Sequence, residues 1–162
     1  MGVEKRTVFT RPDYLIVCGL GSGLVPKAPG TAGSFLGLLL FLPALYLPIP
    51  VQAGIIVAAL AIGIVLSDKV SLEMKVKDPS IIVWDEFVGM WITMLWLPSL
   101  MWLPIAFILF RVFDVLKPGP IGWADRELAG GLGIMVDDVL AGVIALCVLQ
   151  LMSYLLSYSG LF

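Results

Sequence analysis

The sequence predicts an all-α integral membrane protein, folded as a helical bundle of about five spans. Hydrophobic residues make up 60% of its 162 residues, whereas soluble domains reach only about 45 to 50% even with glycine counted. The mean hydropathy is +1.04. Charged residues make up 14% of the chain, which is too little to cover a soluble fold. Because the length suits one domain, we expect residues 1–162 to form a single membrane-embedded domain.

The glycine-rich N-terminal segment is expected to lie at the membrane interface. Its apolar run from Tyr14 to Val25 is broken by three glycines and leads into a segment rich in proline and glycine that ends at Ser34. Prolines follow the run in place of a small-residue cleavage site, so we expect the segment to be retained rather than removed as a signal peptide. The glycines could present successive N–H groups to an anion, or could serve only close packing. Their spacing matches neither the P-loop nor the dinucleotide fingerprint.

Two long apolar runs follow, Phe35 to Leu47 and Val51 to Leu66, with a proline-containing turn at residues 47–50. A hydrocarbon core about 30 Å thick takes about 20 residues to cross, so these runs predict a tight helical hairpin. Small residues about a turn apart in the second run suit close helix contact in lipid. The next segment, Ser67 to Pro79, is the most polar of the chain and is expected outside the hydrocarbon.

The stretch Ile81 to Phe110 is either one kinked span or a second hairpin that turns between Leu97 and Pro104. The charge distribution favours the hairpin, because it brings the basic residues to one side of the membrane and leaves both turns without charge. The positive-inside rule makes that side cytoplasmic. The basic residues are those of the N-terminus together with Lys69, Lys75, Lys77, Arg111, Lys117 and Arg126.

The last predicted span is the apolar run Val139 to Tyr158. It follows a charged segment in which Arg111, Asp114 and Lys117 are three residues apart and would share one face of a helix. Two hairpins and this C-terminal helix make five spans, with the N-terminus inside and the C-terminus outside.

Two pairs of adjacent acids, Asp85-Glu86 and Asp137-Asp138, lie beside apolar spans. A carboxylate in hydrocarbon costs on the order of 2.5 to 3.5 kcal/mol even on lenient scales, so each pair needs an interface, a cation or a basic partner. Salt-bridged helix ends at the headgroup boundary would explain any one of these residues alone. As a group they suit Mg²⁺, which binds one or two carboxylates together with water and substrate phosphate. The other acids expected on this side are Asp78, Asp114 and Asp125.

A metal ion combined with arginine and lysine suits phosphoryl chemistry, because the phosphate charge must be neutralised from several directions. The chain has no histidine, which excludes a phosphohistidine intermediate. Neither of its two cysteines is followed by the loop and arginine of a cysteine phosphatase. A water molecule activated by the metal and an aspartate nucleophile both remain. The net charge of −2 argues against a nucleic-acid partner.

Four blocks of sequence resemble the phosphatidylglycerophosphatase A family. In order, they are Gly19 to Ser34, Ile82 to Trp91, Phe110 to Ile121 and Gly131 to Gly142. The resemblance implies a bacterial inner-membrane lipid phosphatase that depends on Mg²⁺. It would remove the terminal phosphate of phosphatidylglycerophosphate to give phosphatidylglycerol in phospholipid biosynthesis. The implied partners are the phospholipid substrate and the membrane, and the oligomeric state stays open.

Within this resemblance we expect the carboxylates to bind metal and catalyse, and the basic residues to bind the substrate phosphate. The apolar hairpins would hold the acyl chains in the leaflet. The expected metal ligands are Asp78, Asp85, Glu86, Asp137 and Asp138, and the expected catalytic residues are Asp85, Glu86, Asp114 and Asp138. The expected substrate-binding residues are Thr31, Arg111, Lys117 and Arg126, assisted by the backbone of Gly30 and Thr31.

Two other functions remain as alternatives. A CDP-alcohol phosphatidyltransferase also sets acids around Mg²⁺, but its Asp-Gly-x-x-Ala-Arg signature is absent, and the segment Asp125 to Asp138 imitates it only loosely. A small transporter or channel could bind a cation through carboxylates, which would then be needed mid-span on several helices. The acids are instead expected at span ends on one side, which favours a reaction on a lipid headgroup.

Overall fold

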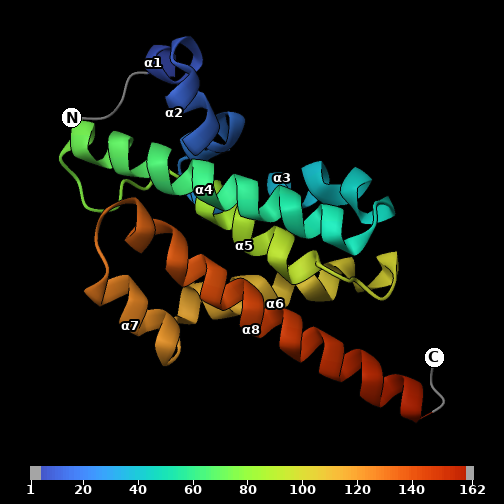
Figure 1. The fold of residues 1–162 in the computed structure, drawn as a ribbon. Coiled ribbons are helices and arrows are strands. Elements are labelled where there is room, and N and C mark those ends of the chain that lie inside the picture. Colours follow the sequence, from blue (N-terminus) through green and yellow to red (C-terminus); the bar gives the residue numbers. More distant parts are fainter. Residues whose placement is uncertain (1–4, 160–162) are drawn as a thin grey trace.

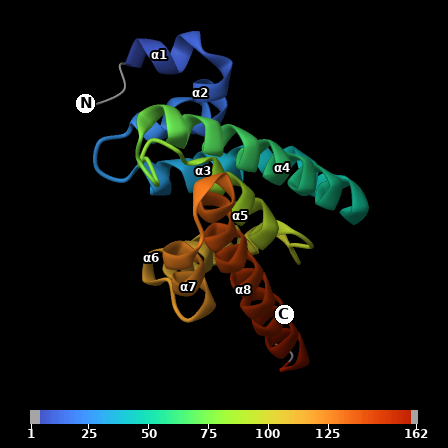
Figure 2. The same cartoon turned by 60° about the vertical axis from the view of Figure 1, so that its left-hand side comes forward.

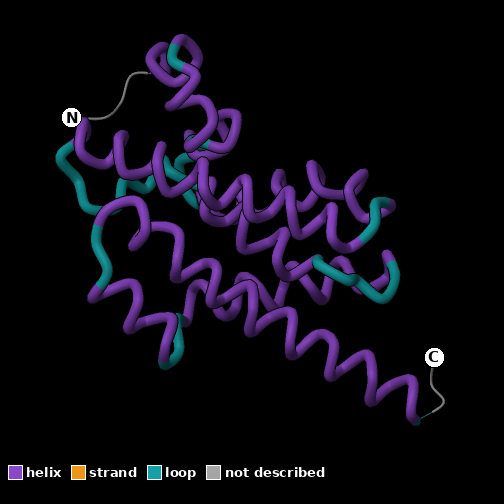
Figure 3. The backbone as a smooth tube through the Cα atoms, in the orientation of Figure 1, coloured by secondary structure: helices purple, strands orange, loops and turns teal. Residues whose placement is uncertain are grey.

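The protein is all-helical, as predicted, and the computed structural model describes residues 5–159 (Figure 1). No strand occurs in that part of the chain. Most of the connecting loops lie at the two ends of the bundle (Figure 3). The elements are α1 (Lys5–Thr10), α2 (Pro12–Val17), η1 (Gly19–Leu24), α3 (Pro29–Phe41), η2 (Leu42–Tyr46), α4 (Ile49–Met74), α5 (Trp84–Met94), η3 (Leu100–Trp102), α6 (Leu103–Leu116), α7 (Pro120–Glu127) and α8 (Gly130–Tyr158).

Three segments are long and apolar enough to cross a membrane: Pro29–Tyr46, Ile49–Met74 and Gly130–Tyr158. The other two predicted spans are shorter, because α5 has 11 residues and α6 has 14. At a rise of 1.5 Å per residue, α5 extends only about 17 Å. The bundle therefore combines three helices of spanning length with one short hairpin.

The stretch Ile81 to Phe110 is a hairpin and not one kinked span. α5 ends at Met94, the chain turns through residues 95–102, and α6 runs back along α5. At the end of this return Arg111 Nη1 lies 3.7 Å from Glu86 Oε1, in the first turn of α5. The charged ends of the two helices thus meet, as the charge distribution predicts.

α5 is the central helix of the bundle, and α3, α4, α6 and α8 pack around it (Figures 1 and 2). All eight residues of its segment 87–94 are buried. Two indole groups fasten it to its neighbours. Trp84 Nε1 donates to the Ala59 carbonyl of α4 at 2.9 Å, and Trp91 Nε1 donates to the Gly37 carbonyl of α3 at 2.7 Å. A helix surrounded in this way can be apolar on nearly every face.

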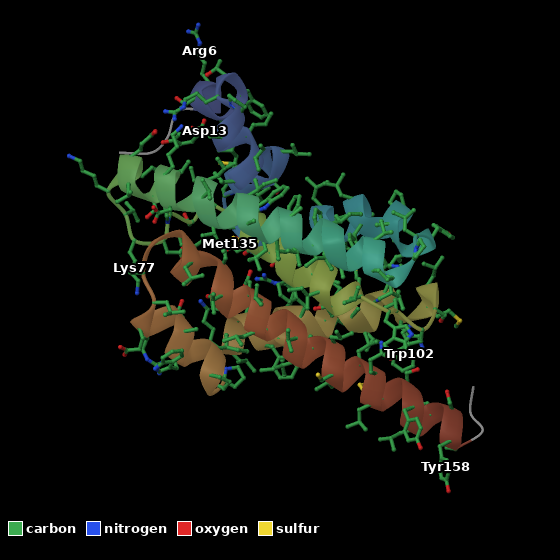
Figure 4. All side chains as sticks on the ribbon, in the orientation of Figure 1. Arg6, Asp13, Lys77, Trp102, Met135 and Tyr158 are labelled. Atoms are coloured by element: carbon green, nitrogen blue, oxygen red, sulfur yellow. The ribbon has the colours of Figure 1, made fainter. Side chains whose placement is uncertain are left out.

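The two ends of the bundle differ in charge. Arg6, Asp13 and Lys77 lie toward one end, and Trp102 and Tyr158 lie toward the other (Figure 4). The turns that join η2 to α4 and α5 to η3 contain no charged residue. A hollow of about 500 Å³ lies between these two turns, and no charged side chain lines it.

Two predicted boundaries differ from the observed ones because packing stabilises helix where glycine and proline suggested a loop. Pro29 stands in the first turn of α3, where its missing N–H is no loss, so the following residues to Ser34 are helical. α8 begins at Gly130 rather than at Val139, and Gly131 lies against the backbone of α4 where a side chain would not fit. Asp137 and Asp138 therefore lie about two turns inside α8.

Four charged residues, Arg11, Asp13, Lys69 and Glu73, fasten α2 to the end of α4. We call them the N-terminal clamp. Arg11 lies 2.6 Å from Asp13 and 2.7 Å from Glu73, and Lys69 Nζ lies 2.7 Å from Asp13 Oδ2. The hydrogen bonds from Arg11 and Lys69 hold the pKa of Asp13 well below its usual range. The clamp fixes the N-terminal helices beside the charged end of the bundle.

Candidate active site

One cavity of about 160 Å³ gathers charged side chains from segments far apart in the sequence. All of these charged residues are among the site residues expected from the sequence. Small and apolar residues complete the wall. The charged residues are Asp78 in the loop before α5, Asp85 and Glu86 on α5, Asp114 on α6, Lys117 at the end of α6, and Asp137 and Asp138 on α8; the others are Pro29, Gly30, Ser80 and Ile82.

The first turn of α5 supplies Asp85 and Glu86. Free N–H groups at the start of a helix favour negative charge there. The position of this turn is set by the preceding residue, because the Val83 N–H donates to the Val17 carbonyl at 2.8 Å. The indole of Trp84 holds the same turn against α4. The acid pair is therefore placed by contacts with both the N-terminal helices and α4.

Asp138 of α8 completes a cluster of three carboxylates, which we call the acid cluster. One oxygen each from Asp85, Glu86 and Asp138 lies within 4.8 Å of the other two. Each of these residues also has one buried oxygen without a hydrogen-bond partner, and so does Asp137. Unpartnered buried carboxylate oxygens are costly, and hard divalent cations bind such oxygens. The acid cluster could therefore hold a metal ion.

Lys117 reaches the cavity from the end of α6. Its Nζ lies 2.7 Å from Asp137 Oδ2 and also donates to Asp125 of α7. Burial by itself lowers the pKa of Lys117, but the hydrogen bonds with Asp125 and Asp137 raise it overall, so the amine is protonated at neutral pH. The residue has left-handed backbone geometry, with φ of 43°, and caps α6. Lys117 thus links α6, α7 and α8 around the cavity.

Arg111 stands between the cavity and α3. Its Nη1 pairs with Asp114 Oδ2 at 2.5 Å, donates to Ser34 Oγ at 3.1 Å and lies 3.7 Å from Glu86. The side chain is only 17% exposed. Its guanidinium therefore supplies positive charge close to the acid cluster from the side of α3 and α6.

Some expected residues lie elsewhere, and one polar lining residue was not expected. Thr31 faces a groove beside the cavity, and Arg126 is exposed on α7 and does not line it. Asp78 does line the cavity, and burial raises the pKa of this residue. Ser80 was missed. The one available signal in the sequence was its position. Ser80 lies between Asp78, the last charged residue of the loop, and the apolar run that leads into α5.

The arrangement places carboxylates suited to a cation beside two basic groups suited to an anion. The acid cluster lies on one side, and Arg111 and Lys117 lie next to it. A phosphate ester carries oxygens that can contact a metal ion and basic side chains together. The cavity therefore has side chains that could bind a phosphate group, and a metal ion held by the acid cluster could polarise it.

Comparison with known proteins agrees with this chemistry. The family model for phosphatidylglycerophosphatase A matches residues 15–153. The phosphatidylglycerophosphatase A of Escherichia coli K12 is 39% identical over 153 residues, covering 93% of this chain and 89% of the relative. That of Haemophilus influenzae is 44% identical over 154 residues, covering 93% and 94%. A Bacteroides thetaiotaomicron relative, named as a candidate phosphatidylinositol-3-phosphatase, is 42% identical over 147 residues, covering 82% and 90%. No solved structure matches the chain significantly.

Proposed function

Because the chain belongs to the phosphatidylglycerophosphatase A family of phosphatases, we propose that it hydrolyses the terminal phosphomonoester of phosphatidylglycerophosphate with Mg²⁺ as cofactor. The products are phosphatidylglycerol and inorganic phosphate, and the reaction serves phospholipid biosynthesis. Water contributes the new oxygen on phosphorus, the bond between phosphorus and the glycerol oxygen breaks, and that oxygen ends with a proton.

The observation that carries this proposal is the set of buried, unpartnered carboxylate oxygens on Asp85, Glu86, Asp137 and Asp138. Ion pairs within the protein do not satisfy them, although Arg111 and Lys117 stand nearby. We assign Asp85, Glu86 and Asp138 as metal ligands, with Asp78 and Asp137 as further ligands at the cavity wall. When bound there, Mg²⁺ would polarise the phosphoryl oxygens and help to generate the nucleophile.

The basic residues and the start of α3 bind the phosphate in this proposal. Arg111 and Lys117 neutralise its charge. The first N–H groups of α3, at Gly30 and Thr31, have no partner inside the helix, and Gly30 lines the cavity. Asp114 positions the guanidinium of Arg111 through their ion pair. Arg126 is exposed and does not line the cavity, so we give it no role in binding. Water and a cavity aspartate both remain as nucleophiles.

We place the protein in the bacterial inner membrane with the cavity toward the cytoplasm. Its relatives are bacterial. The end of the bundle that carries the cavity also carries the basic residues Lys69, Lys75, Lys77 and Lys117, whereas the turns at the other end have no charge. This asymmetry fits the positive-inside rule. The cavity then meets the headgroup layer of the leaflet in which the substrate lies.

The rival functions have less support. The named relatives are phosphatases and not transferases. A transport pathway would need carboxylates along the length of several helices, but those of α5, α6 and α8 gather around one cavity at one end. The lipid-phosphatase function therefore accounts for both the residues and their placement.

The test is phosphate release from phosphatidylglycerophosphate in mixed micelles by the purified protein, with Mg²⁺ or with a chelator. We expect activity only with the divalent cation. Asp85→Asn and Asp138→Asn should lose most of it, whereas Glu127→Gln, which changes an exposed acid on α7, should retain it. No release with any divalent cation would refute the proposed function. Activity of Asp85→Asn within a few-fold of the parent would remove Asp85 from the site.

A further inference from the structure

A groove of about 440 Å³ lies along the outer face of α6. Its apolar wall consists of Phe107, Ile108, Val112, Val115 and Leu116. These residues recur at intervals that place them on one stripe of the helix. Val115 and Leu116 are 67% and 71% exposed, so the stripe is not covered by the rest of the described chain. In a membrane protein such a face meets lipid.

The groove and the candidate active site share a wall. Gly30 lines the cavity and the next residue, Thr31, lines the groove. Across from them Arg111 lines the groove, while its guanidinium pairs with Asp114, which lines the cavity. Arg111 therefore stands at the boundary between the apolar groove and the polar cavity that contains the acid cluster. A positive group at that boundary is complementary to a phosphate attached to an apolar chain.

Another apolar hollow does not have this relation to the site. The hollow of about 500 Å³ lies between the two uncharged turns at the other end of the bundle. It has no charged residue to meet a headgroup. The groove along α6 is continuous with the candidate active site and is lined by the positively charged Arg111, so it can accommodate a lipid that carries a phosphate.

We propose that one acyl chain of the phospholipid substrate lies in the groove along α6, so that the lipid enters the site sideways from the bilayer between α3 and α6. This inference rests on the proposed function. Lipid tails are as apolar as the groove, so little hydrophobic free energy is gained when a chain moves into it. The groove acts instead by orienting the lipid, which sets the phosphate beside Arg111 and the acid cluster.

Photolabelling tests the position of the chain directly. The probes are phosphatidylglycerophosphate and phosphatidylcholine that carry the same diazirine on one acyl chain, each in detergent micelles with the parent protein. We expect the phosphatidylglycerophosphate probe to label residues 103–116 of α6 much more strongly than the phosphatidylcholine probe does. Excess unlabelled phosphatidylglycerophosphate should abolish this difference in labelling. Equal labelling by both lipids would overturn the proposal.

Filling the groove provides a second test. Ile108→Trp and Val112→Trp should lower kcat/KM for the diacyl substrate about tenfold, because a misplaced phosphate reacts slowly. Both should also lose the specific labelling of α6. Val65→Trp, at an exposed site on α4 outside the groove (67% exposed, against 59% for Ile108 and 43% for Val112), is the control and should behave like the parent. If the parent hydrolyses the lipid and both groove variants match it, the groove proposal fails while the proposed function stands. If the parent hydrolyses no lipid, the proposed function itself fails.

Discussion

Gly89 of α5 faces Gly142 of α8 where the two helices that carry the acid cluster cross. A Cβ atom on Gly142 would meet the Gly89 carbonyl oxygen. A Cβ on Gly89 would come within 2.7 Å of the Asp138 carbonyl oxygen and 2.5 Å of the Phe110 ring. Small residues allow helix backbones to approach closely in lipid. This contact brings Asp138 beside Asp85 and Glu86.

Gly142→Ala should therefore destabilise the protein and disturb the acid cluster. Overpacking a tight contact costs about 1 to 3 kcal/mol, since backbone atoms must move. The matched control is Gly54→Ala in α4, where an added Cβ would meet nothing within 4 Å. That change should be neutral or stabilising by up to about 1 kcal/mol. Thermal unfolding in detergent measures both, and equal midpoints for the two variants would contradict the close-contact argument.

Metal binding should appear in stability as well as in activity. Without divalent cation, Asp85→Asn or Asp138→Asn should leave the unfolding midpoint unchanged or raise it, because either change removes one carboxyl group from three whose oxygens lie within 4.8 Å of one another. Mg²⁺ should stabilise the parent by about 2.7 kcal/mol at a concentration of 100 Kd.

Mg²⁺ should stabilise Asp85→Asn and Asp138→Asn much less than it stabilises the parent. It should stabilise Glu127→Gln as much as the parent. Unfolding curves recorded along a Mg²⁺ titration give the comparison. A parent-like response in Asp85→Asn and Asp138→Asn would show that the metal binds elsewhere.

The catalytic activity should fall even when Arg111 is replaced by lysine. Arg111 Nη1 contacts Asp114 and Ser34 together, and lysine carries its charge on a compact ammonium at the end of a flexible chain instead of on a planar guanidinium. We expect Arg111→Lys to lower kcat/KM about tenfold and Arg111→Met about 10²-fold to 10³-fold, the range for loss of a preorganised charge donor. Steady-state kinetics on the lipid substrate check this order. Full activity of Arg111→Met would exclude Arg111 from phosphate binding.

The N-terminal clamp should make stability depend on pH. Because the folded-state pKa of Asp13 is depressed, its ion pairs stabilise the fold above the unfolded-state pKa of about 3.9 and lose this effect as the pH falls toward the folded-state value. The difference in unfolding midpoint between the parent and Asp13→Asn should be largest near pH 6 and should shrink toward pH 3. A difference that stays constant over this interval would mean that Asp13 does not act through its charge.

Composition and charge alone determined the class of fold and the second hairpin. An apolar, weakly charged chain needs lipid as its solvent, and the uncharged turns near Pro48 and Pro98 predicted the second hairpin. The carboxylates of the cavity were also predictable, because an acid beside an apolar span requires a partner. Asp85 and Glu86 are the clearest case.

Local sequence could not show that the glycine-rich segments at Pro29 and Gly130 are helical. Their intrinsic propensity favours a loop, but tight packing against neighbouring helices overrides it.

Only the tertiary structure decided which groups meet. The pair Arg111 and Asp114 is local on α6, whereas Lys117 contacts Asp137 because the chain turns at the end of α6 and α8 crosses nearby. The same packing leaves Arg126 outside the cavity and puts Ser80 in its wall. A sequence shows which side chains need partners, but the close approach of helices such as α5 and α8 determines which partners they have.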